Sequence, residues 1–159
     1  MTTDTQHQHS PQAQHSIETV EIQKATDIAA PIEIAFEAML DELGPDAQMM
    51  DGTAMPFKLE AWPGGRWFRD LGDKAGHLWG HVQVIKPPTL LEICGPLMMS
   101  YPAVNHLQYR FVAQGSGTRL TFVHRGMGLI SPQHREGMPK GWGHWIDKIR
   151  ERAERKRLK

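Results

Sequence analysis

The sequence predicts an α+β protein in which a curved antiparallel sheet of about six to seven strands wraps around a long C-terminal helix. Two observations carry this prediction. Between residues 57 and 126, short segments of alternating apolar and polar residues are separated by turns that contain Gly or Pro. With no helical pattern between them, such strands pair as an antiparallel meander. The segment from residue 141 then places aromatic residues at helical spacing and supplies the gripping helix.

The N-terminal part predicts one strand followed by one or two short helices. Residues 17–28 alternate as a first strand. Pro31 suits the first turn of a helix, and apolar residues continue at helical spacing to Leu43. A Gly-Pro pair ends this helix. Residues 46–55 fit either a second short helix or a loop, and their methionines could line the mouth of a cavity.

The meander follows from alternation and from its turns. A Pro-Gly-Gly turn joins the first two strands as a hairpin, a Pro-Pro pair ends the third, and a Gly-Ser-Gly turn joins the last two. The predicted strands are 57–61, 66–71, 77–85, 90–94, 104–113 and 119–126.

The C-terminal helix has a clear start. Ser131 is a good N-cap and Pro132 suits the first helical position. Pro139 predicts a kink or an interruption. Beyond it, Trp142, Trp145 or Ile146, and Ile149 share one face. Residues 150–159 are so polar that we expect a solvated last turn.

Length and composition favour one ordinary globular domain. At 159 residues, with 40% apolar and 23% charged residues, the chain can bury a sizeable core. Residues 17–157 are the predicted domain, and the polar residues 1–16 are expected to be a disordered tail. No segment is apolar enough to span a membrane, and no secretory signal is expected. Cys94 has no cysteine to pair with, so a cytoplasmic location is expected. The protein is expected to be a monomer or a homodimer.

Charge and histidine spacing argue against several function classes. The net charge is zero, which provides no long-range attraction for nucleic acid. His77 and His81 share a strand face but lie about 13 Å apart along it, too far for one metal ion. No metal and no cofactor are expected.

Four motifs in the right order add a family resemblance: P-G-G-R-W-F at 63–68, G-H-V-Q-V-I-K-P-P-T-L-L at 80–91, G-T-R-L-T-F-V-H-R at 117–125 and G-W-G-H-W-I at 141–146. They resemble the SRPBCC superfamily (START-like, Bet v 1-like), and within it the branch named after the activator of heat-shock protein 90 ATPase. The resemblance implies a helix-grip fold with a ligand cavity between the sheet and the C-terminal helix.

The same resemblance leaves three functions open. The first is a binding protein for a small hydrophobic or aromatic ligand. The second is an enzyme of the polyketide cyclase or dehydratase type that uses the same cavity. The third is an interaction module whose protein partner is a chaperone ATPase. Eukaryotic members that stimulate the chaperone use an additional N-terminal domain, for which the polar N-terminal residues are not expected to provide room.

The inward face of the predicted sheet and helix supplies the candidate site. His124 follows Leu120 and Phe122 on an apolar strand face, where an imidazole could bind a ligand or act as a general base. It is the candidate catalytic residue, and with Tyr109 it would be a polar handle. The predicted lining residues are Phe57, Leu59, Trp67, Leu107, Tyr109, Phe111, Phe122, His124, Trp142 and Ile146.

Overall fold

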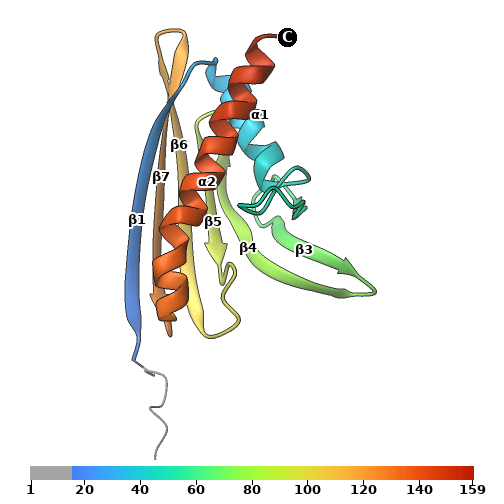
Figure 1. Cartoon of the computed structure of the whole chain (residues 1–159), viewed down its shortest axis with the longest axis vertical. Coiled ribbons are helices and arrows are strands. Elements are labelled where there is room, and N and C mark those ends of the chain that lie inside the picture. The colour runs from blue at the N-terminus through green and yellow to red at the C-terminus, as the bar shows by residue number, and fades with distance from the viewer. Residues whose placement is uncertain (1–15) are drawn as a thin grey trace, which may run out of the picture.

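The computed structural model describes residues 16–159 and confirms the helix-grip α+β arrangement (Figure 1). The predicted tail therefore lies outside the described residues, except for residue 16. In chain order the elements are β1 (Glu18–Ile28), α1 (Ile32–Leu43), β2 (Lys58–Leu59), β3 (Arg66–Gly72), β4 (Ala75–Lys86), β5 (Leu90–Gly95), β6 (Ala103–Gln114), β7 (Gly117–Gly128) and α2 (Pro132–Arg157). Within residues 16–159 the strands form one antiparallel sheet in the order β1-β7-β6-β5-β4-β3-β2.

Alternation along the strands decides which side chains enter the core. Leu107, Tyr109 and Phe111 of β6 are buried, and the residues between them are not. The β6–β7 register sets Tyr109 opposite Phe122, with ring centroids 4.8 Å apart. Because neighbouring strands place such pairs on the same face, one apolar surface forms along the concave side of the sheet.

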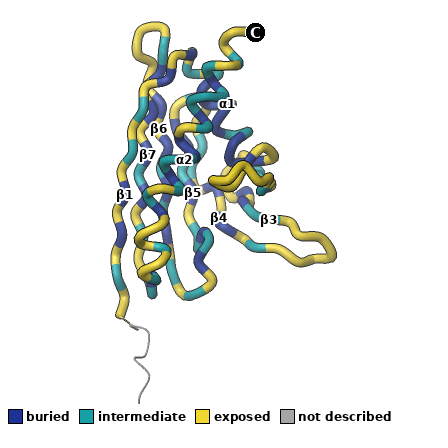
Figure 2. The backbone as a smooth tube through the Cα atoms, in the orientation of Figure 1, coloured by how far each residue is buried: buried dark blue, intermediate teal, exposed yellow. Residues whose placement is uncertain are grey.

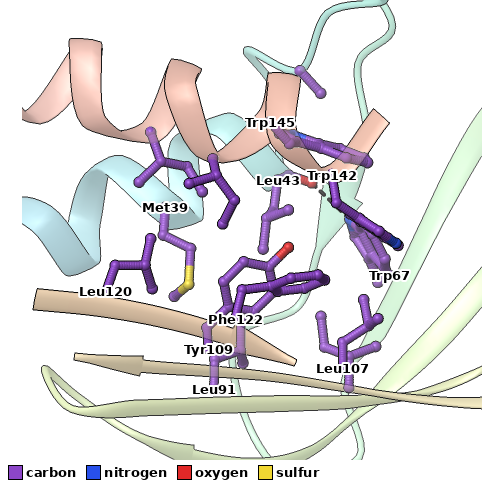
Figure 3. Packing of buried hydrophobic residues seen from close by; sticks show 14 of the residues in the cluster. Met39, Leu43, Trp67, Leu91, Leu107, Tyr109, Leu120, Phe122, Trp142 and Trp145 are labelled. Carbon is purple, nitrogen blue, oxygen red and sulfur yellow. Dashed lines mark hydrogen bonds between the residues drawn. The ribbon is translucent and has the colours of Figure 1, made fainter. Parts of the chain in front are cut away.

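The long helix α2 lies across this surface and also packs against α1 (Figure 1). The ring of Trp142 lies 5.0 Å from that of Phe122. Figure 3 shows Phe122, Tyr109 and Leu43 between the helices and the strands. Core side chains therefore occupy the space beneath α2 around Phe122 and Trp142.

The predicted interruption of the C-terminal helix is wrong, because α2 is continuous from Pro132 to Arg157. Pro139 removes one backbone hydrogen bond, the one that the carbonyl of Arg135 would accept. Arg135 is exposed, so water can serve that carbonyl. Met138 and Trp142, on either side of the proline, are buried and anchor both turns to the core.

The prediction of a solvated last turn over residues 150–159 is wrong where the helix contacts α1, whereas Arg155 and residues 157–159 are exposed as expected. Ala153 is fully buried, and α2 continues along α1. Arg152 forms ion pairs with Asp41, Glu42 and Asp46 of α1 and the loop after it. A polar sequence was compatible with burial here because its charges meet opposite charges on another element.

For the segment after α1, the sequence left open a second short helix or a loop, and the structure has a loop. Residues 44–57 form an irregular loop with an isolated bridge between Gln48 and Ala54, and no second short helix. The strand predicted at 57–61 shortens to the two residues of β2. Phe57 is instead buried against Trp67, with ring centroids 5.1 Å apart.

The β3–β4 hairpin extends away from the body of the molecule (Figure 1), and its outer part is exposed (Figure 2). Residues 70–76 are all exposed, whereas Trp67 and Trp79 at its base are buried. The hairpin thus contributes to the core at its base, and its outer part does not. Neither helix within residues 16–159 is long and apolar enough to cross a membrane.

Candidate ligand-binding cleft

A cleft of about 380 Å³ opens beside α2, where the helix faces the 44–57 loop. Three indoles form much of its wall: Trp79 of β4 and, from α2, Trp142 and Trp145. Its methionines are Met49, Met50, Met55, Met98 and Met138. Its polar side chains are Gln48, Gln133, His134 and His144. Flexible thioethers around rigid aromatic rings suit an apolar or aromatic ligand of variable shape.

The aromatic wall is held in place by hydrogen bonds and ring contacts. Trp142 and Trp145 lie nearly parallel, with centroids 5.6 Å apart and an interplanar angle of 17°. The indole of Trp145 donates a 2.6 Å hydrogen bond to the Glu42 carbonyl near the end of α1. Trp79 meets Trp145 edge-on at 6.1 Å. This surface is therefore preformed, and a ligand would not have to order it.

Two glycines of α2 keep the cleft open. Gly137 and Gly141 both line it, and a Cβ atom added at either position would meet nothing within 4 Å. Glycine in a helix interior costs about 1 kcal/mol relative to alanine. Neither glycine is at a helix end or in a close packing contact, so their one evident structural effect is the space beside Trp142 and Trp145.

His124 supports the aromatic wall from within the core. It is fully buried, its Nδ1 accepts a 3.0 Å hydrogen bond from the Trp142 indole, and its Nε2 donates to the Asn105 side-chain oxygen at 2.7 Å. The amide nitrogen of Asn105 donates in turn to the Gly95 carbonyl. Burial lowers the pKa of His124 to about 4, so the ring is neutral at pH 7. With both nitrogens occupied, the imidazole fixes Trp142 and has no free lone pair for proton abstraction.

A comparison with known protein families identifies the family of this chain. Residues 29–154 match the family described as Activator of Hsp90 ATPase homolog 1-like protein. The chain belongs to this family. The match begins just after β1, runs from α1 through most of α2 and includes every residue that lines the cleft. A comparison with curated protein sequences found no match.

Solved structures share the fold of this family member at low sequence identity. A protein from Rhizobium leguminosarum aligns with a TM-score of 0.66 and 19% identity, over 88% of this chain and 97% of that one. A protein from Chromobacterium violaceum aligns with a TM-score of 0.67 and 17% identity, over 84% and 96%. CalU16 from Micromonospora echinospora aligns with a TM-score of 0.57 and 18% identity, over 90% and 89%. At these identities the alignments establish the fold alone.

The residues predicted to line the site are brought together, but mostly beneath the cleft. Trp142 lines the cleft itself. Leu59 is half-buried at the edge of the core, and the remaining eight are buried inside it: Phe57, Trp67, Leu107, Tyr109, Phe111, Phe122, His124 and Ile146. The Tyr109 hydroxyl has no hydrogen-bond partner among the described residues, and burial raises its pKa. Phe122 and Trp142 connect Tyr109 to the cleft through successive ring contacts.

Among the other residues that line the cleft, the sequence analysis predicted three methionines and missed two histidines. The prediction that Met49, Met50 and Met55 could line a cavity mouth is confirmed. His134 and His144 were missed. The available signal was the two unexplained glycines in α2, flanked at helical spacing by histidine and tryptophan. Within residues 16–159, no group of three or more His, Cys, Asp or Glu is placed to hold a metal ion.

Proposed function

We propose that this protein binds a small apolar molecule with an aromatic ring system in the cleft beside α2. The observation that carries the proposal is the pair Gly137 and Gly141, which leave open space in front of two indoles. Each helical glycine costs about 1 kcal/mol relative to alanine, and at these two positions the missing side chains leave space beside Trp142 and Trp145. A cleft lined by aromatic and thioether groups with a few polar ones matches the chemistry of small-molecule sites.

Binding is favoured over catalysis by how the ionisable groups are arranged. The described lining includes two histidines and no acidic or basic side chain besides them. A cyclase or dehydratase needs a proton acceptor that can reach its substrate. His124, the predicted candidate, has both nitrogens engaged with Asn105 and Trp142. We therefore propose a carrier or sensor of its ligand, and not an enzyme that uses His124 as its base.

Filling the cleft from the helix tests this function. Gly141→Leu is expected to lower the affinity for phenylnaphthylamine, a neutral aromatic probe, by about tenfold or more, because the new side chain occupies the probe's space. The same change is expected to raise helix stability by about 1 kcal/mol. Probe fluorescence and quenching of the cleft tryptophans measure binding, and thermal unfolding measures stability.

Gly143→Leu is the matched control. Gly143 is a helical glycine two residues away that does not line the cleft, and its added Cβ would approach only the Lys24 ammonium, at 3.9 Å. This variant should bind the probe as the wild type does. Unchanged binding in Gly141→Leu would contradict the proposed site.

A further inference from the structure

Arg69 of β3 is, within residues 16–159, the half-buried arginine that has no acidic partner. The other two half-buried arginines are Arg150, which pairs with Asp147, and Arg152, which pairs with three acids. The Nε of Arg69 is buried without a hydrogen-bond partner, whereas its two terminal nitrogens are not buried. A half-buried charge is normally balanced, so this guanidinium points to an anion that the chain does not supply.

The Arg69 guanidinium lies next to the aromatic wall of the cleft. Its Cζ is over the Phe57 ring, 5.6 Å from the centroid, and that ring meets Trp79 edge-on at 4.8 Å. Trp79 is the β4 residue that lines the cleft. His77 is paired with Arg69 in the strand register, and its ring lies 6.2 Å from that of Trp79. Arg69 is therefore separated from the cleft wall by a single layer of side chains.

A ligand group can reach Arg69 from outside. Arg69 and His77 line a hollow of about 680 Å³ on the β3–β4 hairpin, and the acids of this hollow are Asp70 and Asp73. The Asp70 carboxylate already accepts a 2.7 Å hydrogen bond from the Lys58 ammonium. Asp73 lies in the exposed hairpin turn and forms no ion pair with Arg69. The guanidinium thus remains available to an external anion.

The spacing suits a ligand that lies in the cleft and extends past Trp79. Residues two apart on a strand are separated by about 7 Å, so His77 and its cross-strand neighbour Arg69 lie about that far beyond Trp79. A short flexible chain on an aromatic ring covers this distance. The N–H groups of a guanidinium form a planar fork that matches the two oxygens of a carboxylate.

From these observations we infer that Arg69 binds a carboxylate of the ligand. The ring system of that ligand lies in the cleft against Trp79 and the indoles of α2, and its acidic chain passes His77 to reach the guanidinium. The inference rests on the proposed function, and it adds a charged group of the ligand and the residue that selects for it.

A matched pair of competitors tests the role of Arg69. Naphthylbutanoate and its primary amide share one ring system and one short chain, and they differ in the charge of the terminal group. Each is titrated into the wild type loaded with phenylnaphthylamine, and the loss of probe fluorescence measures displacement. The acid is expected to bind about fivefold more tightly than the amide, because a hydrogen bond to a charged group is stronger than one to a neutral group.

Three variants locate the source of this preference. Arg69→Gln should weaken the acid about fivefold and leave the amide and phenylnaphthylamine within about twofold, because glutamine has no charge. Arg69→Lys should keep part of the preference, since an ammonium keeps the charge but lacks the planar fork. Arg110→Gln is the control: Arg110 is an exposed arginine of β6 that lines neither the cleft nor the hollow, so both affinities should be unchanged.

The outcomes separate this inference from the proposed function. Equal affinities of acid and amide for the wild type would overturn the role of Arg69, and so would an unchanged ratio in Arg69→Gln. Failure of the acid to displace bound phenylnaphthylamine would overturn it as well. In each of these cases phenylnaphthylamine still reports an intact cleft. A wild type that does not bind phenylnaphthylamine would instead contradict the proposed function.

Discussion

Lowering the pH from 7 to 4 is expected to remove about 3 kcal/mol of stability through His124 alone. Burial lowers the pKa of this imidazole from 6.5 to about 4 in the folded protein. Each pKa unit of difference between folded and unfolded states corresponds to about 1.4 kcal/mol. The groups that face the ring are Asn105 and Trp142, which are both uncharged, so no carboxylate compensates a proton on His124.

The direction of the effect follows from which state takes up the proton first. The unfolded chain protonates this histidine below about pH 6.5, whereas the folded protein does so only below about pH 4. The stabilisation is therefore complete above pH 6.5 and is lost as the pH falls between these two values. Urea unfolding at intervals from pH 7 to pH 4 measures the free energy of unfolding across this window.

His124→Gln tests whether this histidine causes the decline in the free energy of unfolding as the pH falls. Glutamine keeps one donor and one acceptor for Asn105 and Trp142 but does not titrate, so the decline between pH 6.5 and 4 should flatten. His81→Gln, at an exposed position, should keep the wild-type decline. A hydrogen bond from Arg66 lowers the pKa of Glu60 to about 2, so that carboxylate acts mainly below the window. An unchanged decline in His124→Gln would contradict the assignment to this ring.

The strands could be predicted because their signal is local. Alternation in residues 104–113 and a Gly-Ser-Gly turn are enough to specify the β6–β7 hairpin, and its register then sets Tyr109 opposite Phe122. The inward direction of His124 followed from the same alternation. What its two ring nitrogens contact depends on Asn105 and Trp142, which come from other elements, and no local pattern contains that information.

The cleft could not be predicted because it forms between elements that are far apart in the chain. Its walls come from the 44–57 loop, from Trp79 at the base of the hairpin and from one face of α2. The loop has no periodicity, and helical spacing alone cannot say whether a face of α2 meets the core or an opening. Gly137 and Gly141 mark the open face, and their meaning becomes clear only when the neighbouring indoles are located.

The ion pairs at the end of α2 also could not be predicted from the sequence, because their partners lie on α1 and the loop after it. They give the second large effect that we expect on stability. Arg152→Ala should lower the free energy of unfolding by about 3 kcal/mol, because it leaves a buried carboxylate without its partner. The guanidinium Nε donates to Glu42 at 2.7 Å, and the Glu42 side chain is only 5% exposed. Arg152 also lies 3.3 Å from Asp46 and 3.9 Å from Asp41, so the variant would leave three acids close together.

Arg152→Ala should also affect ligand binding, because the backbone carbonyl of Glu42 holds part of the cleft wall in place. Its carbonyl accepts the hydrogen bond from Trp145, which holds one indole of the cleft wall against the end of α1. Loosening the contact between α1 and α2 should therefore weaken phenylnaphthylamine binding as well as stability, although Arg152 does not line the cleft. Denaturant unfolding and probe titration on the same preparation would measure both effects.

Arg155→Ala is the control for this variant, since it removes the same side chain from an exposed position on the same helix. Its stability should stay within about 0.5 kcal/mol of the wild type, and its probe affinity should be unchanged. Arg152→Lys should fall between the two, because an ammonium keeps the charge but cannot reach three carboxylates in the geometry of a guanidinium. If Arg152→Ala were as stable as Arg155→Ala, the ion pairs would have no structural role, and the cleft wall would have to depend on apolar packing around Ala153 and Trp145 instead.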